Sequence, residues 1–510
     1  MNETAALLRP GGCTVLRSPD PAAPEAPPVE APRGLTIQAG DTDMVKLQLM
    51  DTWQSDLWHA DRWLLANGEH VYVVDAKDPG RPLCKAKRDD AGTFAWEHRS
   101  DDLAANVSKL QGLRALQPQV AVKAEQSWWY VRNDDDKIVV RLLEHRWDSG
   151  PRTLRVVELR GYAKEAAKVR ALLPPGATTD AHPLQVAMAS SGFEPRTWTS
   201  KPALALTRKT TGKVAATEML RRVLELTLEV EDGIHADTDT EFLHDYRVLL
   251  RRARSVLSVM KGVFSEEDTL ALKVGFKEMA SRTNLLRDLD VHLLGRDAQA
   301  ARVPEDLRAD LDPFFDILQK ERNAEHRRLS RFLRSAAYKR ERARLAEQVA
   351  RAEAGPNGGK AVQKLANKRL HKALEKVVRQ GRDIHPDTPD EAVHELRLSC
   401  KKLRYTLELF KGLYDAKHVS TMIKRLKKLQ DVLGEFNDSS VQKIALRDWV
   451  ERHPKVPGRT AFAIGALYDA LHRDQLAQRA QVEGRFALFD TPKLAAQVKA
   501  MTGRPLLEEV

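Results

Sequence analysis

Residues 244–254 read His-Asp-Tyr-Arg-Val-Leu-Leu-Arg-Arg-Ala-Arg, and residues 394–404 read His-Glu-Leu-Arg-Leu-Ser-Cys-Lys-Lys-Leu-Arg. The histidine and all four basic positions of the first stretch return 150 residues later. At about 100° per residue, the basic side chains of each copy gather on one side of a helix and the apolar side chains on the other. A charged helix face is usually only solvated, but such a face normally mixes signs and does not recur in register. The two stretches therefore predict a pair of amphipathic helices with an anion-binding face.

The repeat extends beyond these helices. Residues 261–264 (Lys-Gly-Val-Phe) match 411–414 (Lys-Gly-Leu-Tyr), and the spacing holds without a gap from about 220 to 291. Repeated units of this size bury their apolar faces by stacking on each other. We therefore expect an all-α domain at about residues 205–505. Its two homologous halves, about 210–350 and 360–500, should be related by a pseudo-twofold axis that brings the cationic helices together.

The duplicated His-x-x-Arg-x-x-x-basic-basic-x-Arg helix resembles the CHAD (conserved histidine α-helical domain) family over residues 205–500. Arg287-Asp-Leu-Asp-Val291 is similar to the family's second recurring element, although the second copy reads Asn437-Asp-Ser-Ser440 there. The resemblance implies a basic channel that binds inorganic polyphosphate. The residues expected to bind polyphosphate are His244, Arg247, Arg251, Arg252, Arg254, Lys261, Lys277, Arg287, His394, Arg397, Lys401, Lys402, Arg404, Tyr405, Lys411 and Lys427.

The charge of the chain is divided unevenly. Residues 1–200 hold 25 Lys and Arg against 27 Asp and Glu, a net charge of −2, out of 83 and 72 in the whole chain. Residues 201–510 therefore hold 58 against 45, a net charge of +13. The basic excess belongs to the helical part, which indicates a polyanionic partner for that part.

The N-terminal third differs in character. Residues 1–34 are rich in Pro and Ala and are expected to form a disordered tail. Residues 35–203 contain short β-branched and aromatic runs, a hairpin signal at 133–136 and helical patterns at 164–173 and 184–191. They predict an α+β domain with antiparallel strands, whose order resembles the CYTH family of triphosphate-binding β-tunnels.

The resemblance to an active CYTH tunnel is incomplete. Such a tunnel needs paired glutamates on its first strand to hold a divalent cation. The candidate first strands, 34–38 and 45–49, contain no carboxylate pair, and residues 71–74 read Val-Tyr-Val-Val where arginines are expected. Glu158 and Arg160 are the remaining polar candidates. We interpret this domain as a degenerate, non-catalytic tunnel or a scaffold.

Other motifs do not add a catalytic, metal or cofactor site. Residues 355–361 superficially resemble a Walker A loop but are one residue short and end in alanine, so they are expected to link the two helical halves. Three scattered cysteines, no membrane-length apolar run and no signal-peptide pattern favour the cytoplasm, with association to polyphosphate granules compatible. The sequence does not predict an oligomeric state.

Two alternatives remain open at this stage. The basic helical surface could instead bind nucleic acid, although the cationic helices offer few aromatic platforms for base stacking. The N-terminal domain could be a metal-dependent triphosphatase, which the missing glutamate pair disfavours.

Overall fold

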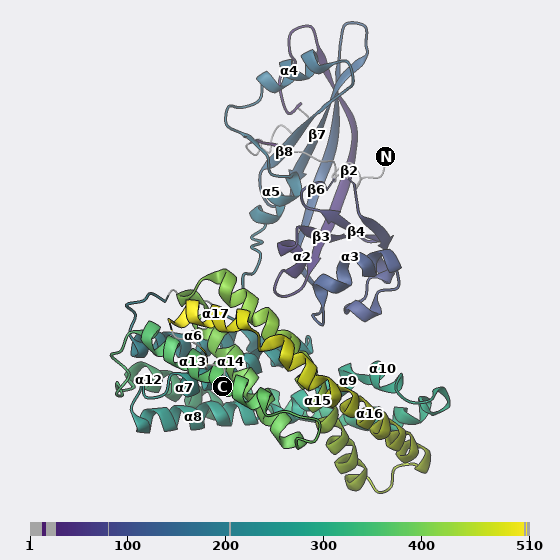
Figure 1. Ribbon diagram of the computed structural model, residues 1–510. Coiled ribbons are helices and arrows are strands. Elements are labelled where there is room, and N and C mark those ends of the chain that lie inside the picture. Colours follow the sequence, from purple (N-terminus) through teal and green to yellow (C-terminus); the bar gives the residue numbers. More distant parts are fainter. Residues whose placement is uncertain (1–12, 17–26, 80, 203–205, 504–505, 507–510) are drawn as a thin grey trace. The chain divides into compact units, whose positions relative to one another are not determined.

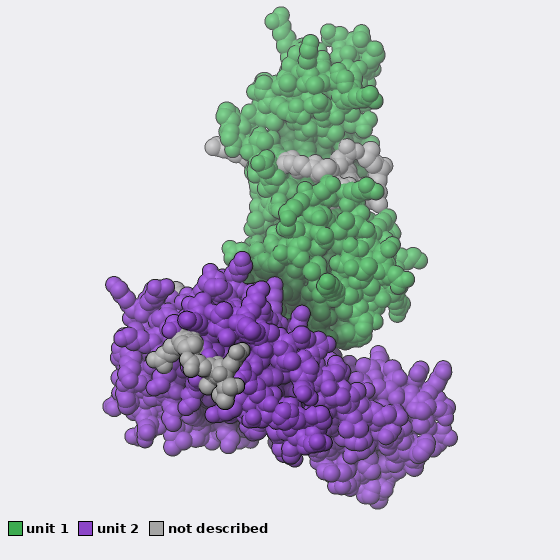
Figure 2. Space-filling model, viewed as in Figure 1, with its two compact units in different colours: residues 1–199 green, residues 200–510 purple. Residues whose placement is uncertain are grey.

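The computed structural model describes residues 13–16, 27–79, 81–202, 206–503 and 506. The chain divides into two compact units (Figure 1), which Figure 2 colours separately. Residues 1–199 form the β-rich unit and residues 200–510 form the helical unit. The prediction of an α+β part followed by an all-α part is confirmed.

The β-rich unit is built on one antiparallel sheet. Its two longest strands, β2 and β6, are 16 residues each and pair along most of their length. In the described part of this unit the strand order is β5-β4-β3-β2-β6-β7-β8-β1-β9. The strands are β1 (Cys13–Leu16), β2 (Thr36–Asp51), β3 (Arg62–Ala66), β4 (His70–Asp75), β5 (Cys84–Lys87), β6 (Gln117–Arg132), β7 (Ile138–Trp147), β8 (Arg152–Glu158) and β9 (Thr178–Thr179).

Short helices and a tight turn complete the β-rich unit. The predicted turn at 133–136 joins β6 to β7, and the Asn133 amide donates to the Lys137 carbonyl at 3.1 Å. The helical patterns predicted at 164–173 and 184–191 correspond to α4 (Ala163–Ala171) and α5 (Pro183–Ser190). The α-helices of this unit are α2 (Asp56–His59), α3 (Asp101–Gln111), α4 and α5, with 3₁₀ turns at Arg88–Asp90 and Ala95–Glu97.

Two expectations for the N-terminal residues need correction. The prediction of a disordered tail over 1–34 is wrong for Cys13–Leu16, which form β1 and pair with β8 and β9. Residues 1–12 and 17–26 lie outside the described residues. The two candidate first strands are parts of one long strand, β2, because a bulge near Gly40 lets the pairing with β6 continue across the polar residues between them.

The helical unit contains the two predicted halves. Segment 352–361 joins them, as expected for the glycine-rich stretch, since one helix ends at Arg351 and the next begins at Val362. The first half consists of α6 (Gly212–Ala236), α7 (Thr240–Val259), α8 (Glu266–Ser281), α9 (Asn284–Leu294), α10 (Arg296–Ala300), 3₁₀ turns at Glu305–Leu307 and Ala309–Leu311, α11 (Asp312–Arg334) and α12 (Ala336–Arg351). The second half consists of α13 (Val362–Arg382), α14 (Asp390–Phe410), a 3₁₀ turn at Lys411–Leu413, α15 (Ala416–Arg452), α16 (Gly458–Phe489) and α17 (Pro492–Thr502).

The pseudo-twofold relation is visible in the backbone. Thr211 and Ala361, which are equivalent in the repeat, form an isolated antiparallel bridge. The Gly212 amide donates to the Lys360 carbonyl and the Val362 amide to the Thr210 carbonyl, each at 2.8 Å. Val362 is the repeat equivalent of Gly212, and Lys360 is the repeat equivalent of Thr210, so exchanging the two halves turns one hydrogen bond into the other, as a twofold axis between them requires.

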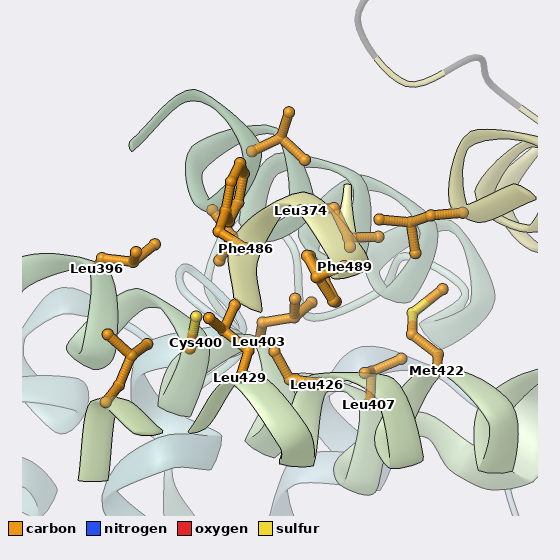
Figure 3. Packing of buried hydrophobic residues seen from close by; sticks show 14 of the residues in the cluster. Leu374, Leu396, Cys400, Leu403, Leu407, Met422, Leu426, Leu429, Phe486 and Phe489 are labelled. Carbon is orange, nitrogen blue, oxygen red and sulfur yellow. The ribbon is translucent and has the colours of Figure 1, made fainter. Parts of the chain in front are cut away.

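The apolar faces of the repeated helices are buried as their pattern predicts. Tyr246, Leu249 and Leu250 of α7 are buried, as are Leu403 and Leu407 of α14. Figure 3 shows the core of the second half, in which α14 packs against α13, α15 and α16. Its labelled residues are Leu374, Leu396, Cys400, Leu403, Leu407, Met422, Leu426, Leu429, Phe486 and Phe489. Burying these faces leaves the opposite, basic faces of α7 and α14 free for other contacts.

A separate apolar cluster lies at the other end of α15. Leu446 and Trp449 of α15 pack with Phe314 and Phe315 of α11 and with α16.

Among the described residues, no helix combines the length and hydropathy needed to cross a membrane.

Candidate functional site

A cavity of about 330 Å³ lies where α7, α14 and α15 meet in the helical unit. We call it the central cavity. Cations from both copies of the repeat line it, so the structure brings the two predicted cationic faces together. Its lining residues are Lys201, His244, Val248, Arg251, Arg252, Arg397, Lys401, Arg404, Tyr405, Glu408, Gln430, Asp431 and Gly434.

The N-terminal cap of α7 helps to fix which side chains face the cavity. The Asp239 carboxylate accepts hydrogen bonds from the amides of Glu241 and Phe242, at 2.9 and 3.3 Å. The Tyr246 hydroxyl, on the apolar face, lies 3.0 Å from the Tyr338 hydroxyl. With the helix held from its buried side, Arg251 projects from the opposite face into the cavity.

One carboxylate joins the two copies inside the cavity. Glu408 of α14 accepts from Arg252 of α7 at 3.1 Å and from Arg404 of its own helix at 2.9 Å. Both Glu408 and Arg252 are largely buried. Burial lowers the pKa of Arg252, and Glu408 opposes that shift. Glu408 therefore holds two guanidinium groups in place at the wall.

Two other cations in the central cavity have no such partner. Within the described part of the chain, neither Arg251 nor Lys401 lies within ion-pair distance of a carboxylate. Burial lowers the pKa of Lys401, and the positive charges of Arg397 and Arg251 lower it further, while Asp438 opposes the shift. Arg251 and Lys401 thus add positive charge to a cavity whose carboxylates, Glu408 and Asp431, form no ion pair with either of them in the described structure.

Several predicted residues lie beside the cavity and are held by hydrogen bonds. Arg247 donates to the Thr283 hydroxyl at 2.7 Å and to the Asn284 side-chain oxygen at 2.8 Å. In the second copy, the equivalent Arg397 lines the cavity and donates to Asp438 at 3.2 Å. His394 Nδ1 lies 2.8 Å from the Asn437 side-chain oxygen.

The remaining predicted residues are placed elsewhere. Arg287 reaches Glu241, with 3.8 Å between the nearest atoms. Lys261 and Lys402 line a second cavity, which lies between α13, α14 and the end of α7. Arg254, Lys277, Lys411 and Lys427 are exposed and line neither cavity.

The sequence pattern did not predict that α15 contributes residues to the central cavity. Gln430, Asp431 and Gly434 line it, although their repeat equivalents are Ala280, Ser281 and Asn284. Because these positions are not repeated, self-comparison of the chain offers no signal for them.

The β-rich unit carries carboxylates in a different arrangement from the one expected. The long strand β2 includes Asp41 and Asp43, which lie between the two predicted first strands, 34–38 and 45–49. Among the described residues, no group of three His, Cys, Asp or Glu side chains is arranged to hold a metal ion. Glu158 accepts from Arg170 at 3.2 Å on an exposed surface.

We expect Lys401→Met to raise the thermal stability of the unliganded protein at pH 7. A lysine with a lowered pKa carries a charge that destabilises the fold below that pKa, and this cost fades as pH rises towards 10.5. Methionine keeps the packing of the aliphatic stem and removes the charge. The gain in melting temperature should therefore shrink between pH 7 and pH 10. Lys277→Met, at an exposed position, controls for the loss of one charge; an equal gain in both variants would contradict this account.

Comparisons with known proteins match the helical unit. A family model described as "CHAD domain" matches residues 218–447. Solved structures similar to the chain include the CHAD domain from the plant Ricinus communis, at 24% identity and a TM-score of 0.44, over 59% of this chain and 96% of that one. They also include PptA from Streptomyces chartreusis, at 17% identity and a TM-score of 0.43, over 54% and 99%. No curated protein matches the chain.

Proposed function

The chain contains a CHAD domain, and from this premise we propose that its helical unit binds inorganic polyphosphate in the central cavity. One observation carries the proposal: cations from both repeat copies converge on one cavity, and Arg251 and Lys401 there have no carboxylate partner among the described residues. A polyanion supplies the missing negative charge.

The chemistry of the lining suits a chain of phosphates. Polyphosphate carries a charge on every unit and has no bases to be recognised, so affinity depends on many ionic contacts and on the release of condensed counterions. The arginines can each contact two phosphate oxygens, whereas Lys401 acts as a point charge. Glu408 keeps Arg252 and Arg404 oriented, so less side-chain entropy is lost when the anion binds.

We propose binding without catalysis for both units. In the central cavity Glu408 is engaged by two arginines, and the other groups are chiefly cations suited to holding an anion. The β-rich unit is proposed to be a degenerate CYTH-like domain that serves as a scaffold. Association of the protein with polyphosphate granules would follow from the binding activity of the helical unit.

Ligand selectivity tests the proposal. The full chain should be titrated with long-chain polyphosphate, single-stranded DNA and duplex DNA at about 150 mM salt, near physiological ionic strength. We expect polyphosphate to bind at least about tenfold more tightly than either DNA, because Tyr405 is the one aromatic side chain among the lining residues described, too few for the stacking that single-stranded DNA uses. Equal affinity for all three polyanions would favour the nucleic-acid alternative. Metal-dependent release of phosphate from tripolyphosphate would contradict the non-catalytic assignment.

A further inference from the structure

A second cavity, of about 460 Å³, lies between α13, α14 and the C-terminal end of α7. Most of its rim is basic. Its wall includes Val259, Ala373 and the largely buried Ser399 and Thr406. Its lining residues are Ser258, Val259, Lys261, Arg369, Lys372, Ala373, Glu375, Lys376, Arg379, Ser399, Lys402 and Thr406.

The positive charge of this cavity is hardly balanced by the protein. Glu375 is its one carboxylate in the described structure, and it pairs with His371 at 3.1 Å. Arg369 donates to the Lys261 carbonyl at 3.0 Å, which ties α13 to the end of α7. Burial lowers the pKa of Lys402, and the charges of Lys376, Arg369 and Lys372 lower it further. The cations therefore lie close enough to repel one another.

The repeat provides an internal comparison for this surface. On α6 the equivalent of Lys372 is Arg222, which pairs with Glu225 at 3.3 Å and with Glu229 at 3.9 Å. The counterparts of Arg369, Lys376 and Arg379 are Met219, Leu226 and Glu229. The same helix position is thus neutralised in one half and strongly basic in the other. Because like charges at i,i+4, such as those of Lys372 and Lys376, destabilise a helix, the basic excess on this face of α13 is not explained by stability or by duplication.

The two cavities are distinct. They share no lining residue. On α14 the central cavity takes Arg397, Lys401 and Arg404, whereas the second cavity takes Ser399, Lys402 and Thr406. At 100° per residue these two sets lie on helix faces about 165° apart. A ligand in one cavity does not occupy the other.

From this geometry we propose that the second cavity binds a compact organic phosphate, with two or three linked phosphate groups at the basic rim and a small apolar group against Val259 and Ala373. The cavity has the size of a small-molecule pocket. Inorganic polyphosphate has no apolar part that could use this wall. This site goes beyond the proposed function, because it assigns a different ligand to a different set of residues.

Calorimetric titration of the full chain with ATP, free of divalent cations, tests the proposal. ATP is the probe because it joins three phosphates to a ring system. We expect saturable binding that weakens at least about tenfold in Lys372→Ala/Lys376→Ala. Both lysines are exposed, and neither lies within ion-pair distance of a carboxylate in the described structure, so the fold should be retained. Tripolyphosphate, which lacks the organic part, should bind more weakly than ATP to Arg251→Ala/Lys401→Ala, a variant in which the central cavity no longer holds inorganic phosphates.

Two matched variants separate this site from its surroundings. Arg221→Ala/Arg222→Ala removes the same charge from the symmetry-related helix α6 and should leave ATP binding unchanged. Arg251→Ala/Lys401→Ala, in the central cavity, should also retain ATP binding while long-chain polyphosphate binding falls. Loss of ATP binding in the central variant, or no loss in Lys372→Ala/Lys376→Ala, would overturn the proposal, as would tripolyphosphate binding to the central variant as tightly as ATP. Polyphosphate binding that survives in the central variant would instead contradict the proposed function.

Discussion

Arg251→Ala/Lys401→Ala is expected to lower the affinity for long-chain polyphosphate by at least about 100-fold at 150 mM salt. Each hydrogen bond to a charged group contributes about 1.5–3 kcal/mol, and about 1.4 kcal/mol corresponds to a factor of ten. These two side chains come from different copies of the repeat and lack carboxylate partners in the described structure, so their charge is available to the anion. The unliganded variant should remain folded, because the burial of Lys401 opposes its charge.

The matched control for this variant is Lys277→Ala/Lys427→Ala. These lysines are also equivalent in the repeat and were predicted to bind, but they are exposed and line neither cavity. We expect less than about a threefold loss of affinity, since exposed charges away from the ligand are screened. The slope of log K against log[salt] should fall by about one per lost contact in the central variant and stay nearly constant in the control. Equal losses in both variants would mean that overall charge, and not the cavity, determines binding.

Glu408→Gln is expected to destabilise the unliganded protein by about 3 kcal/mol, since removing one partner of a buried ion pair leaves the other charge uncompensated. Here two guanidinium groups, those of Arg252 and Arg404, lose their carboxylate, and Glu408 is only 14% exposed. Urea denaturation measures the loss. Glu347→Gln is the control, since its pair with Arg351 is exposed and should contribute less than about 1 kcal/mol.

Polyphosphate should restore much of the stability that Glu408→Gln removes. The anion can take the place of the missing carboxylate, so saturating ligand should raise the melting temperature of the variant more than that of the wild-type protein. A variant that is destabilised but gains no extra stabilisation from polyphosphate would show that Glu408 lies outside the binding site. Unchanged stability without ligand would show that the ion pairs do not form in solution.

The pattern of the repeated helices predicted much of this architecture. Apolar residues such as Leu249 and Leu403 recur at helical spacing, so the buried faces, the opposing basic faces and the twofold relation could all be deduced from one chain. The position of Arg251 and Lys401 in one cavity follows from that relation.

Other features depend on tertiary packing that periodicity does not encode. Lys277 and Lys427 occupy equivalent positions in the repeat, as Arg251 and Lys401 do, but both lysines are exposed to solvent on their helices. Cys13–Leu16 form a strand only because β8 offers an edge for pairing. The repeat does not predict the second cavity, because the cations on α13 differ from their counterparts on α6.

The helix α15 is long enough to pack in both apolar clusters of the helical unit. Its 37 residues span about 55 Å as one rod, with Leu426 and Leu433 in the core of the second half and Trp449 in the cluster with α11. The cavity residues Gln430, Asp431 and Gly434 belong to the same uninterrupted rod. Local fraying at either end leaves the other end anchored. Amide protons near Gln430 and Gly434 should therefore exchange with solvent only in openings that release the core of the second half, so the α15 side of the central cavity should be among the slowly exchanging parts of the unit.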